Sequence, residues 1–260
     1  MRLDQFARLA LVALLLLVLA VLVVRAVTRE RRDYALFKRM TDTRDRQRVY
    51  RRWLAESWVV LGGLSAVLLL ATWPLLGPAL RSTQRWAPIA ALRADLATPV
   101  GAAVGIGIGV LILAAMVLPI VFIRGRVDEI PAVGDVRALL PRNRDELRFG
   151  AGLGLTAGVV EEALFRLTLP ALMFGIVGDG VLAFAASAVV FGLLHVYQGP
   201  LGVLFATLLG LLFAFAYVVT GWLLVPMALH AVLDLRSLVL IPALLGGAWR
   251  RPAPAPDPAA

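Results

Sequence analysis

Long apolar runs, separated by short stretches rich in arginine, dominate the chain. A transmembrane helix needs roughly 20 consecutive apolar residues, and runs of about that length recur along the sequence. They cover residues 9–24, 58–80, 100–123, 149–174, 181–196, 201–219 and 223–245. We therefore expect an all-α fold, a polytopic transmembrane helix bundle of about seven spans.

Composition supports a membrane protein and narrows its chemistry. Hydrophobic residues make up 60% of the 260 residues, and the mean hydropathy is +0.85, far above the values of soluble domains. The chain has no cysteine, which excludes disulfides and thiolate chemistry. The net charge of +9 comes almost wholly from arginines in the loops. This placement is typical of membrane topology, so we expect contact with membrane lipid and no nucleic-acid partner.

The basic segments predict the orientation of the spans. Residues 25–52 carry ten arginines and Lys38, and residues 124–148 and 249–251 are also basic. By the positive-inside rule these segments are cytoplasmic, which places the N-terminus outside and the C-terminus inside. The expected location is the cell inner (plasma) membrane, with the chain as a multi-pass protein.

A small set of ionisable residues lies inside the apolar runs. A charge at the bilayer centre costs roughly 2.5–3.5 kcal/mol, so such residues are candidates for function. They include Glu161, Glu162, Arg166, His195, His230 and Asp234.

The spacing of these residues groups them. Glu162 and Arg166 are four residues apart, as are His230 and Asp234, so each pair shares one helix face. His195 likewise shares a face with Phe191. Three helices could therefore converge on one pocket.

Two kinds of chemistry fit two carboxylates and two histidines. In the first, Glu161, His195, His230 and Asp234 hold a divalent metal such as zinc. In the second, no metal takes part: Glu161 and His195 activate water as general base, while His230 and Asp234 stabilise an oxyanion. A buried polar network that holds helices together, or a proton or ion relay, are the competing interpretations.

The order of three motifs resembles one protein family. Glu161-Glu162-Ala-Leu-Phe-Arg166, Phe191-Gly-Leu-Leu-His195 and His230-Ala-Val-Leu-Asp234 follow one another on successive apolar runs. This order is similar to the CPBP family of intramembrane metalloproteases, also called Abi, which includes the type II CAAX prenyl endopeptidases. The resemblance covers about residues 149–245.

The resemblance implies an activity and a role for each motif residue. Glu161 and His195 would activate the attacking water, and His230 and Asp234 would bind the oxyanion or a metal. Glu162, Arg166 and Phe191 would support the site. The sequence departs from the family pattern at Leu167, where a glycine often stands, and at Asp234, where the prenyl endopeptidases have asparagine.

The resulting interpretation is an intramembrane endopeptidase that hydrolyses a peptide bond of a membrane-associated or lipidated protein or peptide. The alternatives are a non-catalytic membrane scaffold or bacteriocin-immunity protein of the same family, and a small proton-coupled transporter.

Four parts of the chain are expected. Residues 1–57 form an N-terminal membrane anchor and a basic cytoplasmic segment, and residues 58–148 add further spans and loops. Residues 149–247 form the protease-like core, and residues 248–260 form a disordered tail rich in proline and alanine.

Overall fold

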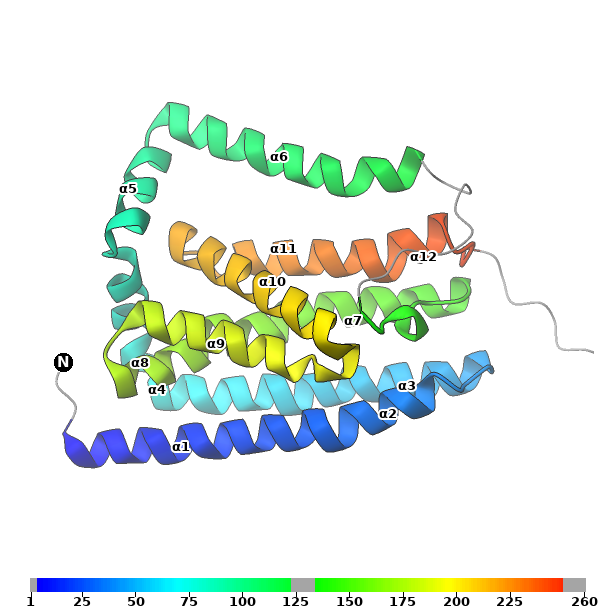
Figure 1. Ribbon diagram of the computed structural model, residues 1–260, viewed down its shortest axis with the longest axis horizontal. Coiled ribbons are helices and arrows are strands. Elements are labelled where there is room, and N and C mark those ends of the chain that lie inside the picture. The colour runs from blue at the N-terminus through cyan, green and yellow to red at the C-terminus, as the bar shows by residue number, and fades with distance from the viewer. Residues whose placement is uncertain (1–3, 123–133, 250–260) are drawn as a thin grey trace, which may run out of the picture.

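The computed structural model describes residues 4–122 and 134–249, and the secondary structure of these residues is helical, without strands. The long helices run side by side, α5 crosses one end of them, and α6 lies at the outer edge (Figure 1). The helices are α1 Gln5–Val24, η1 Arg25–Glu30, α2 Arg31–Phe37, α3 Thr43–Glu56, η2 Ser57–Gly62, α4 Gly63–Gln84, α5 Ala87–Leu96, α6 Pro99–Phe122, η3 Arg137–Leu139, α7 Arg144–Glu162, η4 Ala163–Thr168, α8 Leu169–Val177, α9 Gly180–Leu194, η5 Val196–Gln198, α10 Gly199–Thr220, α11 Leu224–Leu235, η6 Arg236–Leu240 and α12 Ile241–Leu244.

The expected all-α membrane bundle is confirmed. Five described helical segments are long and apolar enough to cross a membrane: Gln5–Phe37, Thr43–Gln84, Pro99–Phe122, Val196–Thr220 and Leu224–Leu244. The two other predicted spans fall on Gly180–Leu194, a shorter apolar helix, and on the helical run that carries the glutamate pair. Seven spans therefore stay a prediction. Residue 123, the first part of the basic segment 124–148 and the tail from residue 250 lie outside the described residues.

The helix that carries the glutamate pair widens directly after it. α7 ends at Glu162, the π-helical turns of η4 follow, and α8 continues to Val177. Pro170 lies in the first turn of α8 and cannot donate a hydrogen bond to the carbonyl four residues earlier. The helical run nevertheless continues through Pro170 to Val177. The π-helical turns of η4 are a feature often found at functional sites.

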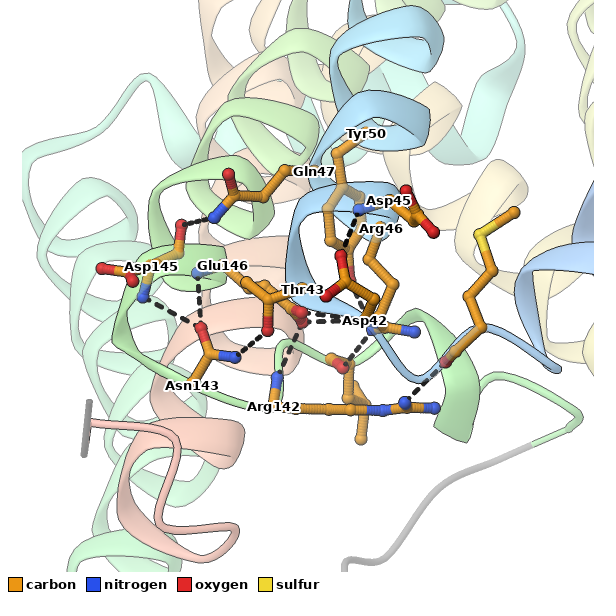
Figure 2. A network of polar contacts seen from close by, with 12 residues as sticks. Asp42, Thr43, Asp45, Arg46, Gln47, Tyr50, Arg142, Asn143, Asp145 and Glu146 are labelled. Atoms are coloured by element: carbon orange, nitrogen blue, oxygen red, sulfur yellow. Dashed lines mark hydrogen bonds and ion pairs between the residues drawn. The ribbon is translucent and has the colours of Figure 1, made fainter. Parts of the chain in front are cut away.

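A buried ion pair joins α3, which belongs to the basic N-terminal segment of residues 25–52, to the start of α7 (Figure 2). Arg46 and Glu146 are both fully buried, and Nε of Arg46 lies 3.1 Å from each carboxylate oxygen. Nη2 of the same arginine donates to the hydroxyl of Tyr50 at 2.9 Å and to the carbonyl oxygens of Ala138 and Leu140 at 3.1 Å. At least one arginine of the basic segment is therefore part of the protein interior.

Helix caps extend this junction (Figure 2). Asp42 accepts the backbone N–H groups at the start of α3, and Asn143 accepts those at the start of α7. The amide of Asn143 also donates to the hydroxyl of Thr43 at 2.8 Å. The starts of α3 and α7 are thus held at a fixed register, which positions the helix that ends in the glutamate pair.

We expect Arg46→Met to destabilise the protein strongly. Removing one partner of a buried ion pair leaves the other charged and unpaired, at a cost of about 3–5 kcal/mol. The matched control is Arg48→Met in the same helix, because Arg48 pairs with Asp45 at the surface, with side chains 71% and 48% exposed. The control should change stability by about 0–1 kcal/mol. The measurement is the yield of monodisperse protein in detergent and its thermal unfolding midpoint; equal values for the two variants would contradict the role of Arg46.

Candidate active site

Three glycines on one face of α7, Gly150, Gly154 and Gly158, let α11 and the η6 turn that follows it pack directly against α7. A Cβ atom at Gly150 would lie 2.6 Å from the carbonyl oxygen of Leu238, and one at Gly158 would lie 2.9 Å from that of Met227. A Cβ at Gly154 would lie 2.8 Å from the Cβ of Asp234. These distances are too short for any side chain, so only glycine permits this approach. The contact sets α11, with His230 and Asp234, directly against the helix of the glutamate pair.

Glu162 is the centre of the polar contacts. Its side chain is fully buried, and Oε1 accepts a hydrogen bond from Nδ1 of His230 at 2.7 Å. Its Oε2 lies 3.0 Å from Nε of Arg166, an ion-pair distance, although the orientation of the two groups does not make a hydrogen bond. The pair expected from the spacing of Glu162 and Arg166 is present, and the link to His230 joins α7 to α11.

Arg166 is held between aromatic rings. Its guanidinium carbon lies 4.5 Å from the ring centroid of Phe191 and 5.2 Å from that of Phe213. Its Nη1 and Nη2 have no hydrogen-bond partner among residues 4–122 and 134–249. Cation–π attraction is worth about 2 kcal/mol when desolvated, so the rings supply part of the missing stabilisation.

The remaining polar side chains surround Nε2 of His230. This atom lies 4.0 Å from Oε2 of Glu161 and 3.8 Å from Oδ2 of Asp234. His195, at the C-terminal end of α9, places Nδ1 2.8 Å from the carbonyl oxygen of Phe191. Because a carbonyl oxygen only accepts, Nδ1 of His195 carries the hydrogen, and Nε2 of a neutral imidazole is left with its lone pair.

Two cavities share a wall that includes Glu161 and His195. The larger, of about 630 Å³, is lined by Glu161, His195, His230 and Asp234 together with apolar residues of α7, α10 and α11. The smaller, of about 180 Å³, is lined by Glu161 and His195 and by residues of the N-terminal segment. The structure therefore brings together the residues that the three sequence motifs single out.

The sequence motifs miss the N-terminal wall of the smaller cavity. Glu30, Tyr34 and Trp53 line it, and Glu30 is ion-paired with Arg25, whose Nε lies 2.8 Å from Oε1. These residues lie in a segment whose arginines predict topology, and no spacing connects them with residues more than 100 positions later. Phe213 is missed as well, because nothing distinguishes it within an apolar run.

The imidazole and carboxylate groups of the candidate site are of the type that binds zinc, but the distances between them do not fit a zinc ion. Imidazole and carboxylate are ordinary zinc ligands, and two donors on one zinc lie about 3.3 Å apart. Nε2 of His230 is farther than this from both neighbouring carboxylates, at 4.0 and 3.8 Å. Within residues 4–122 and 134–249, no three His, Asp or Glu side chains are grouped to hold a metal ion. We therefore assign no chemical step to zinc, which stays a prediction tested below.

Comparison with known proteins adds a family likeness to this buried carboxylate–imidazole site. Residues 143–236, a little over a third of the chain, match the family model described as "Type II CAAX prenyl endopeptidase Rce1-like". This segment carries all three motifs and is similar to that family of CAAX-type proteases. No curated protein and no solved structure matches the chain.

We expect Gly154→Ala to lower activity without removing any polar group. The added Cβ would lie 2.8 Å from the Cβ of Asp234, so α11 must move away from α7. Gly152→Ala is the control, because its Cβ would meet only side-chain atoms of Leu54 at 3.4 and 3.5 Å. Turnover of a membrane-anchored peptide reporter should fall at least tenfold for Gly154→Ala, since misplacement by about 1 Å costs up to about 100-fold. Equal turnover of the two variants would show that this helix contact does not set the site.

Proposed function

We propose that the chain is an intramembrane endopeptidase that hydrolyses a peptide bond of a membrane-associated or lipidated protein or peptide. The observation that carries this proposal is the wall, including Glu161 and His195, that the two cavities share. A substrate backbone that passes from one cavity to the other would cross this pair. The family match supports protease chemistry at this point of the chain.

Glu161 and His195 activate the attacking water in this proposal. The carboxylate of Glu161 takes a proton from water, and the resulting hydroxide adds to the carbonyl carbon of the scissile bond. The hydrogen bond from Nδ1 of His195 to Phe191 leaves the Nε2 lone pair available to orient the water. Collapse of the tetrahedral intermediate breaks the C–N bond, and the proton taken by Glu161 passes to the leaving amine.

His230 and Asp234 stabilise the oxyanion. Glu162 accepts the Nδ1–H of His230, and its negative charge stabilises a doubly protonated imidazole. In this form His230 donates its Nε2–H to the developing charge. Asp234, in its protonated form, is a second donor 3.8 Å from that nitrogen. Arg166 and Phe191 act on this arrangement indirectly, by holding Glu162 and the histidine rings.

The surroundings indicate where the substrate comes from. The larger cavity is walled mainly by apolar side chains, including Leu153, Phe205 and Leu209, which suits a lipid-anchored or membrane-embedded peptide. The chain is a multi-pass membrane protein, and we propose the cell inner (plasma) membrane as its location, with the basic segments in the cytoplasm. Membrane lipid and a protein or peptide substrate are the partners.

Glu161→Gln tests the function directly. Glutamine keeps the shape of the side chain and cannot take a proton, so cleavage should stop while the yield of folded protein stays normal. The measurement is a proteomic comparison of membranes from cells that express wild type or Glu161→Gln, with a search for peptide ends that occur only with wild type. Identical peptide ends in both samples would argue for a non-catalytic protein.

Arg166→Ala serves as the contrasting variant in the same experiment. Both Arg166 and Glu162 are almost fully buried, with side chains 1% and 0% exposed, so loss of the arginine leaves a buried charge. The cost of about 3–5 kcal/mol should lower the folded yield itself. Normal yield for Arg166→Ala, or reduced yield for Glu161→Gln, would contradict the division into chemistry and support.

Asp234→Asn separates the two mechanisms. Asparagine donates a hydrogen bond without a titratable proton but is a poorer metal ligand than a carboxylate. If Asp234 is an oxyanion donor, we expect the variant to retain activity within about tenfold of wild type, and activity to be unaffected by a chelator. Turnover of the peptide reporter is measured with and without the chelator.

The opposite result supports the metal mechanism. In that case Asp234→Asn is inactive, added zinc restores part of its activity, and a chelator inactivates wild type. This pattern would overturn the donor role of Asp234 and leave the family activity intact.

A further inference from the structure

Each histidine of the site has an aromatic ring lying almost parallel to it. The ring of Phe213 lies 4.9 Å from that of His230, with 22° between the ring planes. The ring of Tyr197 lies 6.0 Å from that of His195, with 29° between the planes. Phe191 contacts both imidazoles at steeper angles, 52° with His195 and 87° with His230.

Hydrogen bonds alone leave the imidazole planes loosely defined. Each histidine has one close hydrogen-bond partner in the described part of the chain, and this partner is at Nδ1: Phe191 for His195 and Glu162 for His230. One bond fixes one ring atom, whereas the torsion about the Cβ–Cγ bond of histidine is broad. The direction of Nε2, the atom that faces the reaction, therefore needs a second restraint.

The rings of Phe213 and Tyr197, each nearly parallel to its own histidine, are themselves held in place by other residues. Phe213 is 1% exposed and its ring also faces the guanidinium of Arg166. The hydroxyl of Tyr197 accepts a hydrogen bond from Gln198 at 2.9 Å, and the edge of its ring meets Tyr34 of α2 with centroids 5.6 Å apart. Phe213 carries no reactive group and can act only by restraining its histidine, whereas Tyr197→Phe, described below, separates the effect of the Tyr197 ring from that of its hydroxyl.

We propose that Phe213 and Tyr197 are positioning residues that set the planes of His230 and His195 and so aim Nε2 of His230 at the developing oxyanion and Nε2 of His195 at the attacking water. The effect on turnover rests on the proposed function, whereas the effect on the imidazole planes does not. Through Tyr34, which lies outside the family-matched residues, the N-terminal segment takes part in positioning His195.

The composition of the chain allows the orientation of each imidazole to be measured directly. His195 and His230 are its only histidines, so selective histidine labelling gives two Cε1–H signals in an NMR spectrum of the full chain in nanodiscs. His195→Asn and His230→Asn assign the two signals. Removing a stacked ring shifts its histidine signal through the lost ring current alone, so the imidazole orientation is read from NOE cross-peaks between each Cε1–H and the ring of Phe191. This ring contacts both histidines and is unchanged in every variant.

The two leucine variants are controls for each other. Phe213→Leu should change the cross-peaks of His230 with Phe191 and leave those of His195 unchanged, and Tyr197→Leu should do the reverse. Phe213→Tyr and Tyr197→Phe keep the rings and should keep both signals near their wild-type positions. Phe213→Met takes the place of Phe213→Leu if the latter does not fold.

Turnover should follow the same pattern. Each leucine variant should lower kcat on the peptide reporter at least tenfold with KM nearly unchanged, because the loss concerns alignment rather than substrate binding. The conservative variants should restore kcat. A purely structural role would lower yield and leave kcat per folded molecule unchanged.

Clear outcomes overturn the proposal. It fails if both leucine variants leave the cross-peaks of both histidines with Phe191 unchanged, or if these cross-peaks change while kcat stays at the wild-type value. If the cross-peaks change as expected but wild type itself cleaves nothing, the positioning of the histidines stands and the proposed function fails. The two failures are therefore distinguishable.

Discussion

The arrangement of the candidate site depends on the two contacts of the buried Glu162 carboxylate, one with His230 and one with Arg166. The carboxylate binds His230 through one oxygen and pairs with Arg166 through the other, so a single side chain joins α11 to η4. A fully buried carboxylate is tolerable only when charge and hydrogen bonds compensate for its lost hydration. Glu161, one residue earlier, makes no comparably close polar contact with the described residues and lines both cavities. Two identical side chains thus have different surroundings because of where each one points.

The N-terminal third of the chain is more than a membrane anchor. Its residues enclose the smaller cavity beside Glu161 and His195, and Arg46 anchors it to the start of α7. The residues that match the family model begin at 143, so this wall lies outside the matched segment. The likeness to the family therefore says nothing about residues 25–57, which form one side of the candidate site.

The sequence predicts the local parts of the site well and the contacts between helices poorly. Pairs four residues apart, such as Glu162 with Arg166 and His230 with Asp234, follow from helix geometry, and apolar runs predict the helices that carry them. The hydrogen bond between Glu162 and His230 joins residues 68 positions apart, which no periodicity encodes. Arg46 is equally hidden, because ten arginines in one segment look alike until the fold buries one of them. Phe213 could not be singled out either, because it is one of several aromatic residues in the long apolar helix α10.

The glycine face of α7 has a mechanical consequence. Between most helices, separation is set by interlocking side chains, which shift and repack when one of them changes. Here main-chain atoms of η6 and α11 lie where the side chains of Gly150 and Gly158 would be, so the backbone itself limits the distance between the helices. The spacing from Glu161 to His230 is therefore held by parts that cannot compress or change rotamer. Any change in the width of the larger cavity has to come from its other walls, such as α10, while α7 and α11 keep their distance.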